Sequence, residues 1–463
     1  MAEKFKFAPR DVSELKNEYD LIIIGSGAAG LTSAIQAKEL GLKPIILEKM
    51  DKLGGNSTRA SSGMNAAETL VQLKHNVVDS FDDFYEETYV GGGKLNNTEL
   101  LRYFSNHAAS SVEWLADHKI FLEDITITGG MSKMRTHRPA SMAPIGAFLV
   151  TELLKQIKLL DIPLFAGVNV KELLLDTEQK ICGMKVVANG APKKIITKAI
   201  ILATGGFGAN QDMLVKYRPD LKGYKTTNQP GATGDGIKLA QKVGAKVVDM
   251  DQIQIHPTVQ QDNDHAYLIG EAVRGEGAIL VNKAGKRFVN ELDTRKVVSN
   301  SIDELDEGGA YLIFDKSIRD RVKAVEFYAS IGLVKTEDSL GKLALENELD
   351  ERSLVTTIEE WNKSVETHND FKFGRKTGMD RSIKEEPYNL IHIAPAVHYT
   401  MGGVGINSKT EVLTDNNSVI AGLYACGEIV GGLHGNNRIG GNSIAETVIF
   451  GRQSGQQVFN YLR

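Results

Sequence analysis

The chain has 463 residues and 42% hydrophobic content, which is ordinary for a globular protein and enough for two or three domain cores. Its formal net charge of -5 gives no general attraction for nucleic acid, so an anionic ligand would need a local positive pocket. The two cysteines, Cys182 and Cys426, fit no metal, haem or iron–sulfur spacing, so we expect no metal site.

The N-terminal residues contain no apolar run of signal-peptide length. No later stretch reaches the roughly eighteen apolar residues that a membrane span requires. We therefore expect a cytoplasmic protein with no stable membrane insertion and no nucleic-acid partner.

The first predicted unit is a strand over residues 19–24, followed by the glycine-rich turn GSGAAG and a helix. Gly25 permits the tight turn, Gly27 lets the backbone approach a pyrophosphate, and Gly30 allows close packing of helix on strand. The N-terminus of the helix would face the negative charge of the pyrophosphate. This order of elements is typical of a dinucleotide-binding fold.

A second strand over residues 43–48 ends in Glu48, at the distance from Gly30 expected for a carboxylate that binds a ribose hydroxyl pair. The following segment, LGGNSTRASSGMNAA, carries more small and hydroxylated residues than NAD needs. A further strand over residues 199–203 runs into Thr204 and Gly205.

Between about residues 251 and 394 the glycine-rich junctions stop and the composition becomes more polar. We interpret this stretch as an inserted domain. Within it, Glu271 and Arg274 lie three residues apart on one predicted helical face, and Arg295 follows a hairpin length downstream.

This arginine–glutamate pattern suggests a proton relay. Because arginine keeps its proton at ordinary pH, it can act as an acid only toward a much stronger base such as a carbanion. That chemistry points to reduction of an activated C=C bond. The alternative is a surface network of ion pairs without catalytic function.

Near the C-terminus, another strand leads into Gly427 and Glu428, and a helix opens near Asn442. Both ends of the chain would therefore meet around one cofactor. Free backbone N–H groups at Ser443 and Ile444 would stabilise the negative charge that a reduced isoalloxazine develops. Capping of this helix by the side chain of Asn442 or Ser443 is a compatible reading.

The chain contains, in this order, the motifs GSGAAGL, GGNS, ATGGFG, QIHPT, EAVRGEGAILVN, HYTMGGV, GEIVGG and HGNNRIGGNS. Taken together, they resemble the flavoprotein subunit family of fumarate reductases and succinate dehydrogenases, most closely its soluble single-chain fumarate reductases. The resemblance spans nearly the whole chain. It implies an α/β fold in which a Rossmann-like FAD-binding domain, residues 1–250 and 395–463, carries an inserted α+β capping domain, residues 251–394.

The resemblance also implies the FAD contacts. We expect them from the following residues: Gly25, Gly27, Ala28, Ala29, Gly30, Glu48, Lys49, Gly55, Asn56, Ser57, Ser61, Ser62, Gly63, Val170, Thr204, Gly205, Asp235, Tyr399, Gly427, Glu428, Ser443 and Ile444. Membrane-complex members attach flavin through a histidine in a Ser-His-Thr motif, and this chain has Asn56, Ser57 and Thr58 at the comparable place. We therefore expect noncovalent FAD.

For the substrate, the resemblance implies a small dicarboxylate. One carboxylate would bind Arg438 and His398 and the other would bind His256, with Gln254 and Gly441 also in contact. Arg295 would protonate the substrate, and Arg274 with Glu271 would resupply the proton. Gly270 departs from the family pattern, in which many members have a hydroxyl residue that helps to hold a carboxylate.

Reduction of fumarate to succinate is the function we expect, with electrons from an external donor, either reduced flavin or a redox protein. The alternatives among enzymes are another enoate reductase, of the urocanate or methacrylate type, and L-aspartate oxidase. A flavoprotein electron carrier is the alternative without catalysis.

Overall fold

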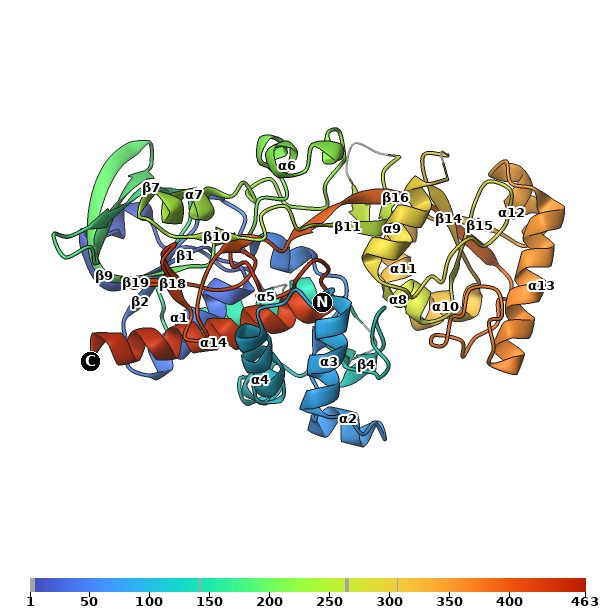
Figure 1. The fold of residues 1–463 in the computed structure, drawn as a ribbon, viewed down its shortest axis with the longest axis horizontal. Helices are drawn as coiled ribbons and strands as arrows, with labels where there is room; N and C mark the ends of the chain where they lie inside the picture. The colour runs from blue at the N-terminus through green and yellow to red at the C-terminus, as the bar shows by residue number, and fades with distance from the viewer. Residues whose placement is uncertain (1–4, 141–142, 263–265, 306) are drawn as a thin grey trace.

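The structure is a computed structural model, and it describes residues 5–140, 143–262, 266–305 and 307–463. Two halves lie side by side along the longest axis, and the long strands β11 (Ile253–Gln260) and β16 (Tyr388–Thr400) run from one half into the other (Figure 1). The chain crosses between the halves on these two strands.

The first half is built on an eight-stranded sheet whose centre is parallel. Residues Leu21 to Ile24 of its central strand are all buried, as expected for a parallel strand covered on both faces. The strands of this sheet, in spatial order, are β18 (Glu411–Leu413), β19 (Val419–Ala425), β9 (Ala191–Leu202), β1 (Glu18–Ile24), β2 (Pro44–Leu47) and β6 (Leu164–Phe165), with β7 (Val168–Leu175) and β8 (Ile181–Ala188) attached through β9.

Helices cover this sheet, and the two that open on it, α1 (Ala28–Glu39) and α14 (Asn442–Leu462), pack against each other. Glycines permit their close approach, since a Cβ on Gly451 would lie 2.9 Å from Ala29 O. The remaining helical segments of this half are η1 (Val12–Glu14), η2 (Gly55–Arg59), α2 (Leu70–Lys74), α3 (Phe81–Gly91), α4 (Thr98–Asp117), α5 (Ile145–Leu159), α6 (Gln211–Tyr217), η4 (Pro219–Leu221) and α7 (Asp235–Lys242).

Two smaller sheets complete the first half. The three-stranded sheet contains β3 (Met64–Asn65), β5 (Thr136–Arg138) and β4 (Asp124–Thr126), and the two-stranded sheet contains β10 (Val247–Val248) and β17 (Gly403–Val404). Together with the parallel sheet and its helices, they confirm the α/β class predicted from the sequence.

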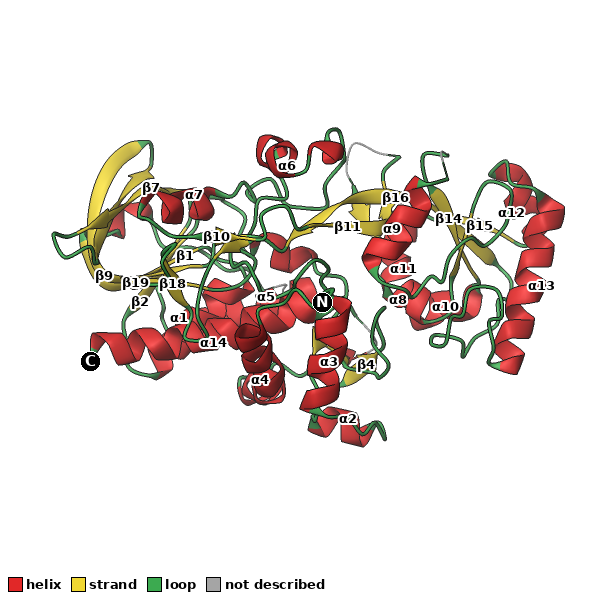
Figure 2. Ribbon diagram, in the orientation of Figure 1, coloured by secondary structure: helices red, strands yellow, loops and turns green. Residues whose placement is uncertain are grey.

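The second half surrounds the far ends of β11 and β16 with short strands and helices (Figure 2). Its sheet is antiparallel. Its other elements are β12 (Tyr267–Leu268), α8 (Ala272–Gly275), β13 (Ile279–Val281), α9 (Arg295–Asp303), β14 (Ala310–Phe314), α10 (Lys316–Arg321), α11 (Ala324–Ser330), β15 (Lys335–Glu337), α12 (Leu340–Glu346) and α13 (Glu351–Thr367).

Each half has its own hydrophobic core. One cluster of buried side chains takes residues from 15 to 253 and from 397 to 458, and the other takes residues from 269 to 393. These clusters divide the chain near residues 251 and 394, and the domain boundaries placed there remain a prediction. The active-site groups should gather where the two clusters meet.

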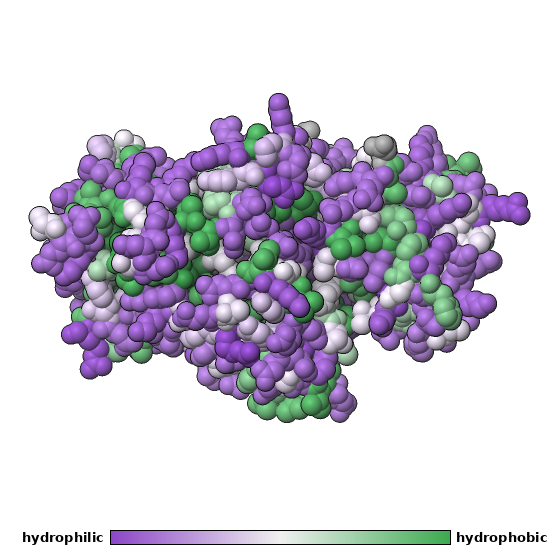
Figure 3. All heavy atoms as spheres, in the orientation of Figure 1, coloured by the Kyte–Doolittle hydropathy of each residue, from purple (hydrophilic) through white to green (hydrophobic). Residues whose placement is uncertain are grey.

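The visible surface is mostly hydrophilic, and hydrophobic side chains gather at its lower edge over α2 (Figure 3). Leu70 and Leu73 are exposed there. Within the described ranges, no helix has the length and apolar character needed to cross a bilayer.

Candidate active site

One large cavity runs from the carboxyl ends of the parallel strands to the second half, with about 1460 Å³ of empty space when its open mouth is included. It brings together most of the predicted FAD contacts. Those that line it are Gly25, Gly27, Ala29, Glu48, Lys49, Gly55, Asn56, Ser57, Ser61, Ser62, Val170, Thr204, Gly205, Asp235, Tyr399, Glu428, Ser443 and Ile444. Ala28, Gly30, Gly63 and Gly427 do not line it and lie next to residues that do.

The glycine-rich turn leaves backbone open to this cavity. Gly25 has a φ of +111°, and a Cβ there would lie 2.2 Å from Ala203 O. A Cβ on Gly30 would lie 2.0 Å from Gly25 O, so this glycine lets α1 pack on β1. In contrast, a Cβ on Gly27 would meet only ordinary van der Waals contacts, with Ser57 Oγ at 3.5 Å and Gly54 O at 4.0 Å, so the space beside it is open for a ligand. The turn therefore fits a bound pyrophosphate.

Glu48 lies just past the end of β2 and is buried. Its carboxylate accepts hydrogen bonds from Ser26 N–H at 3.0 Å, from Ser26 Oγ at 2.7 Å and from Met50 N–H at 2.8 Å. These bonds hold the carboxylate at the cavity wall, where it can accept further bonds from ribose hydroxyls.

The N-terminus of α14 also faces the cavity. Its N-cap is Gly441, with φ +89° and no side-chain cap, so the expected capping by Asn442 or Ser443 is wrong. The helix begins at Asn442, which is earlier than that reading requires. Among the described residues, no group accepts a hydrogen bond from the N–H of Ser443 or Ile444. Both N–H groups are therefore available to a ligand with partial negative charge.

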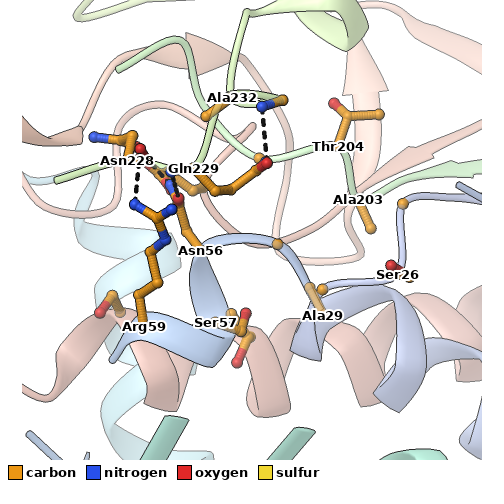
Figure 4. Close-up of a pocket in the computed structure, with 18 of the residues that line it drawn as sticks. Ser26, Ala29, Asn56, Ser57, Arg59, Ala203, Thr204, Asn228, Gln229 and Ala232 are labelled. Atoms are coloured by element: carbon orange, nitrogen blue, oxygen red, sulfur yellow. Dashed lines mark hydrogen bonds between the residues drawn. The ribbon is translucent and has the colours of Figure 1, made fainter. Parts of the chain in front are cut away.

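Several polar residues of this wall were not found from the sequence. Arg59 Nη1 donates to the carbonyls of Thr227 and Asn228, at 2.9 and 3.0 Å (Figure 4). Asn56 Nδ2 donates to Asn228 Oδ1 at 2.5 Å, and Asn56 Oδ1 accepts from Gln229 N–H. The polar segment TTNQPGATGD, residues 226–235, is the sequence signal that would have indicated them.

Glu428 is partly buried at the same wall. Burial raises its pKa to about 7, although hydrogen bonds from Thr400 N–H and Asn56 Nδ2 act in the opposite direction. Its carboxyl group can thus gain or lose a proton near neutral pH.

At the boundary with the second half, Arg295 forms the first turn of α9 and lines the cavity. Its Nε donates to Glu271 Oε1 at 2.7 Å, and its Nη1 donates to Gln254 Oε1 at 3.1 Å. Gln254 Nε2 in turn donates to the carbonyl of Arg438 at 2.7 Å. Gln254 therefore connects the predicted proton donor Arg295 with the predicted substrate ligand Arg438, and it does not line the cavity itself.

Glu271 and Arg274 lie behind Arg295. Glu271 is the N-cap of α8, and its Oε1 lies 3.5 Å from Arg274 Nη2. Burial favours the neutral acid, but the charge and hydrogen bond of Arg295 together with the charge of Arg274 outweigh it and lower the pKa of Glu271 to about 2. All three side chains are at most 5% exposed, so they are not the surface network considered as an alternative.

Two histidines from different strands meet beside this pair, with ring centroids 5.0 Å apart. His256 Nδ1 accepts a hydrogen bond from Thr258 N–H, so the proton of its neutral ring lies on Nε2, which has no partner. His398 Nδ1 shares a 2.8 Å hydrogen bond with Thr227 Oγ1. Burial and then the positive charge of Arg295 hold both pKa values well below 6.5.

Arg438 lines the cavity with an incompletely bonded guanidinium. Its Nη1 donates to Ile439 O at 3.3 Å, and neither Nε nor Nη2 has a partner. Its Cζ lies 4.5 Å from the centroid of the Tyr399 ring. Burial, followed by the charge of Arg295, lowers the pKa of Arg438 to about 9.

Two glycines follow Arg438. Gly441, a predicted substrate contact, packs on Asn65 and does not line the cavity. Gly440 was not predicted, and it lies against the Glu271–Arg295 pair: a Cβ there would come 2.1 Å from Glu271 Oε2. The glycine doublet was the only sequence signal for it.

The charges of this boundary do not cancel. Among the described residues, Arg274 and Arg295 both form an ion pair with Glu271, and Arg438 forms none. The two histidines are neutral, so positive charge exceeds negative charge where these side chains meet. Such a buried excess is costly unless an anion enters. The described residues contain no group of three or more His, Cys, Asp or Glu side chains that could bind a metal ion.

The chain is similar in sequence and structure to known proteins. The family model described as "FAD binding domain" matches residues 20–444. A protein of Klebsiella pneumoniae (strain 342) named "NADH:fumarate oxidoreductase" is 47% identical over 442 residues, which are 95% of this chain and 47% of that protein. The chain thus spans about half the length of this relative.

A Shewanella frigidimarina protein named "Fumarate reductase (cytochrome)" is 40% identical over 445 residues, which are 96% of this chain and 77% of that protein. Among solved structures, the open conformation of a flavocytochrome c3 fumarate reductase matches with a TM-score of 0.79 and 35% identity. That match covers 97% of this chain and 79% of the other.

Proposed function

Because the chain belongs to the flavoprotein family that shares the FAD binding domain and includes the fumarate reductases just compared, we propose that it is an FAD-dependent fumarate reductase that reduces fumarate to succinate. The chain covers only part of its first relative, so activity, substrate and donor are argued from the site.

The observation that carries the proposal is the excess of positive charge at the boundary of the halves, with unpaired donors on Arg438 and His256. A dicarboxylate dianion would compensate this excess better than a monoanion, and its two ends could accept from both unpaired donors. The site therefore favours a small enedioate over a monocarboxylic enoate.

In the proposed complex, Arg438 and His398 hold one carboxylate of fumarate and His256 Nε2 donates to the other. These cationic and N–H donors withdraw electron density from the double bond. When bound, FAD supplies the hydride that one alkene carbon receives.

Arg295 supplies the proton for the other alkene carbon. Its guanidinium is fixed by Glu271 and Gln254, so its remaining nitrogen can be aimed at the substrate. After the transfer, the proton returns to Arg295 through Glu271 and Arg274. One hydride and one proton are added, and succinate leaves as a dianion.

The cofactor is FAD, and we infer that it is bound noncovalently, because Ser57 occupies the place of the attaching histidine and its Oγ accepts a hydrogen bond from Ala28 N–H. The reductant is an external donor, either a reduced flavin or a redox protein. A cytoplasmic location also remains a prediction.

Anaerobic oxidation of the photoreduced protein tests the function. Fumarate should reoxidise the flavin rapidly, and urocanate, methacrylate and iminoaspartate should do so at least about a hundredfold more slowly. Faster oxidation by one of these three would move the assignment to that substrate. Oxidation by none of the four would make the protein an electron carrier.

A further inference from the structure

Ser61 and Gly270 face each other across the boundary between the two halves. A Cβ on Gly270 would lie 3.1 Å from Ser61 Oγ and 3.2 Å from Ser61 Cβ. The backbone at residue 270 does not require glycine, because no positive φ is found there. The serine side chain therefore occupies space that a side chain at residue 270 would otherwise take.

The hydroxyl of Ser61 is available to a ligand. It lines the same cavity as Arg295, His398 and Arg438. No described residue forms a hydrogen bond with Ser61 Oγ, whereas the Ser61 carbonyl accepts one from Arg138 Nη2 at 2.6 Å. A partly buried hydroxyl without a protein partner is ready to donate to an anion.

The surroundings of this hydroxyl are positively charged and polar. Arg138 is 1% exposed, its Nε has no partner, and no described carboxylate forms an ion pair with it. On the other side, Tyr328 is buried, and its hydroxyl accepts a 3.2 Å hydrogen bond from Gly270 N–H. A carboxylate placed on the cavity side of Ser61 would thus meet a hydroxyl donor with a buried guanidinium behind it.

Gly270 directly precedes Glu271, which holds Arg295. This places the Ser61 hydroxyl near the segment that holds the proton donor. We infer that Ser61 is a specificity-determining residue of the substrate site, whose hydroxyl donates to the carboxylate of the enedioate that is remote from Arg438. This reassigns Ser61 from the expected flavin contacts to the substrate, and it rests on the proposed function.

A reciprocal exchange of the two residues tests the inference. Ser61→Ala removes only the hydroxyl and should raise the Kd of succinate and the KM of fumarate about tenfold, with kcat changed less than threefold. Gly270→Ser should also weaken binding, because its Cβ crowds Ser61. The double variant S61G/G270S should recover to within about threefold of the wild-type Kd, because the hydroxyl is restored from the opposite wall.

The controls separate this inference from its alternatives. Ser330→Ala, on the exposed face of the helix that carries Tyr328, should leave both constants unchanged. A loss of FAD affinity in Ser61→Ala with unchanged succinate binding would assign the hydroxyl to the cofactor and overturn the inference. Losses that simply add in the double variant would also overturn it, although fumarate turnover by the wild type would still stand. If the wild type reduces no dicarboxylate, the proposed function and this inference fail together.

Discussion

Arg295 is held from two sides, by Glu271 at Nε and by Gln254 at Nη1. Because the guanidinium is planar, hydrogen bonds to two of its nitrogens fix the orientation of the third nitrogen. A lysine ammonium group could not be oriented in this way. Glu271 offsets part of the repulsion that Arg295 meets from the neighbouring Arg274 and Arg438.

From this geometry, Arg295→Lys should lower kcat by at least about a hundredfold, which is the usual contribution of a positioned proton donor. The shorter side chain loses both anchors, while FAD content should stay at the wild-type level. Anaerobic kcat with fumarate and the flavin absorbance of the purified variant measure the two effects. Arg319→Lys, partly exposed on α10, is the matched control, and near-normal turnover by Arg295→Lys would exclude the assigned role.

A second residue-scale prediction concerns Glu271, whose pKa of about 2 keeps it ionised at any pH of assay. Glu271→Gln keeps the shape and removes the charge, so kcat should fall roughly tenfold or more while the KM of fumarate rises less than about threefold. The solvent isotope effect on kcat should increase because proton supply becomes slower. Glu276→Gln, the next carboxylate along the chain, should change neither value. An unchanged rate in Glu271→Gln would make Glu271 structural.

At the scale of elements, β11 and β16 each bring one histidine to the boundary. Their antiparallel pairing is irregular, with register shifts between Gln254 and Ile255 and between His256 and Val259. Bulges of this kind change the direction of the side chains that follow them, compared with a regular pair of strands. In this pair of strands the rings of His256 and His398 lie next to each other.

The β1–turn–α1 unit gives a prediction that separates cofactor binding from folding. Gly30→Ala places a Cβ 2.0 Å from Gly25 O, so the apoprotein should lose roughly 2 kcal/mol or more of unfolding free energy. Gly27→Ala meets no atom closer than Ser57 Oγ at 3.5 Å, so the apoprotein should keep its stability and lose FAD affinity, because the methyl group occupies the pyrophosphate space.

Urea unfolding of both apoproteins and FAD titration of the folded variants measure these effects. The two glycines act as each other's control, since they share one turn. Equal destabilisation of the two apoproteins would show that Gly27 is needed for folding and not for the cofactor.

At the scale of the whole molecule, a chain of net charge -5 holds a buried excess of positive charge where its two cores meet. Helices α8 and α9 of the second half contribute Arg274 and Arg295, and a loop of the first half contributes Arg438, so neither half contains the complete site. Closing the cavity around a dianion would remove water and strengthen each of these contacts.

This arrangement predicts how affinity depends on pH. Arg438 has a pKa of about 9 in the empty site, so it is charged below that pH and loses its proton above it. Because the dianion binds the charged form, the Kd of succinate should be flat from pH 7 to about pH 8 and then rise by about tenfold per pH unit above pH 9. Binding should also take up a proton in that upper range.

Titration of succinate by flavin absorbance between pH 7 and 10 measures this dependence, and FAD affinity over the same range is the control. A Kd that stays flat through pH 10 would contradict the lowered pKa of Arg438. A rise already at pH 7 would assign the dependence to a histidine instead.

The sequence by itself determined the α/β class, the glycine-rich turn, the FAD requirement and the identity of the flavoprotein family. It could do so because these features depend on local order: a strand, a turn and a helix must follow each other within about thirty residues. The roles assigned to individual site residues, the noncovalent cofactor and the domain boundaries stay predictions.

Only the tertiary structure decided how distant segments share one space. Three features join residues far apart in the chain: the contact of Gly440 with Glu271, the wall formed by Arg59 and Asn228, and the opposition of Ser61 to Gly270. The structure also placed the open N-terminus of α14 at the cavity. The hydrophobic pattern of a sequence does not predict which side chain fills the space beside a distant glycine. That depends on how the two halves pack and on how β11 and β16 are bent.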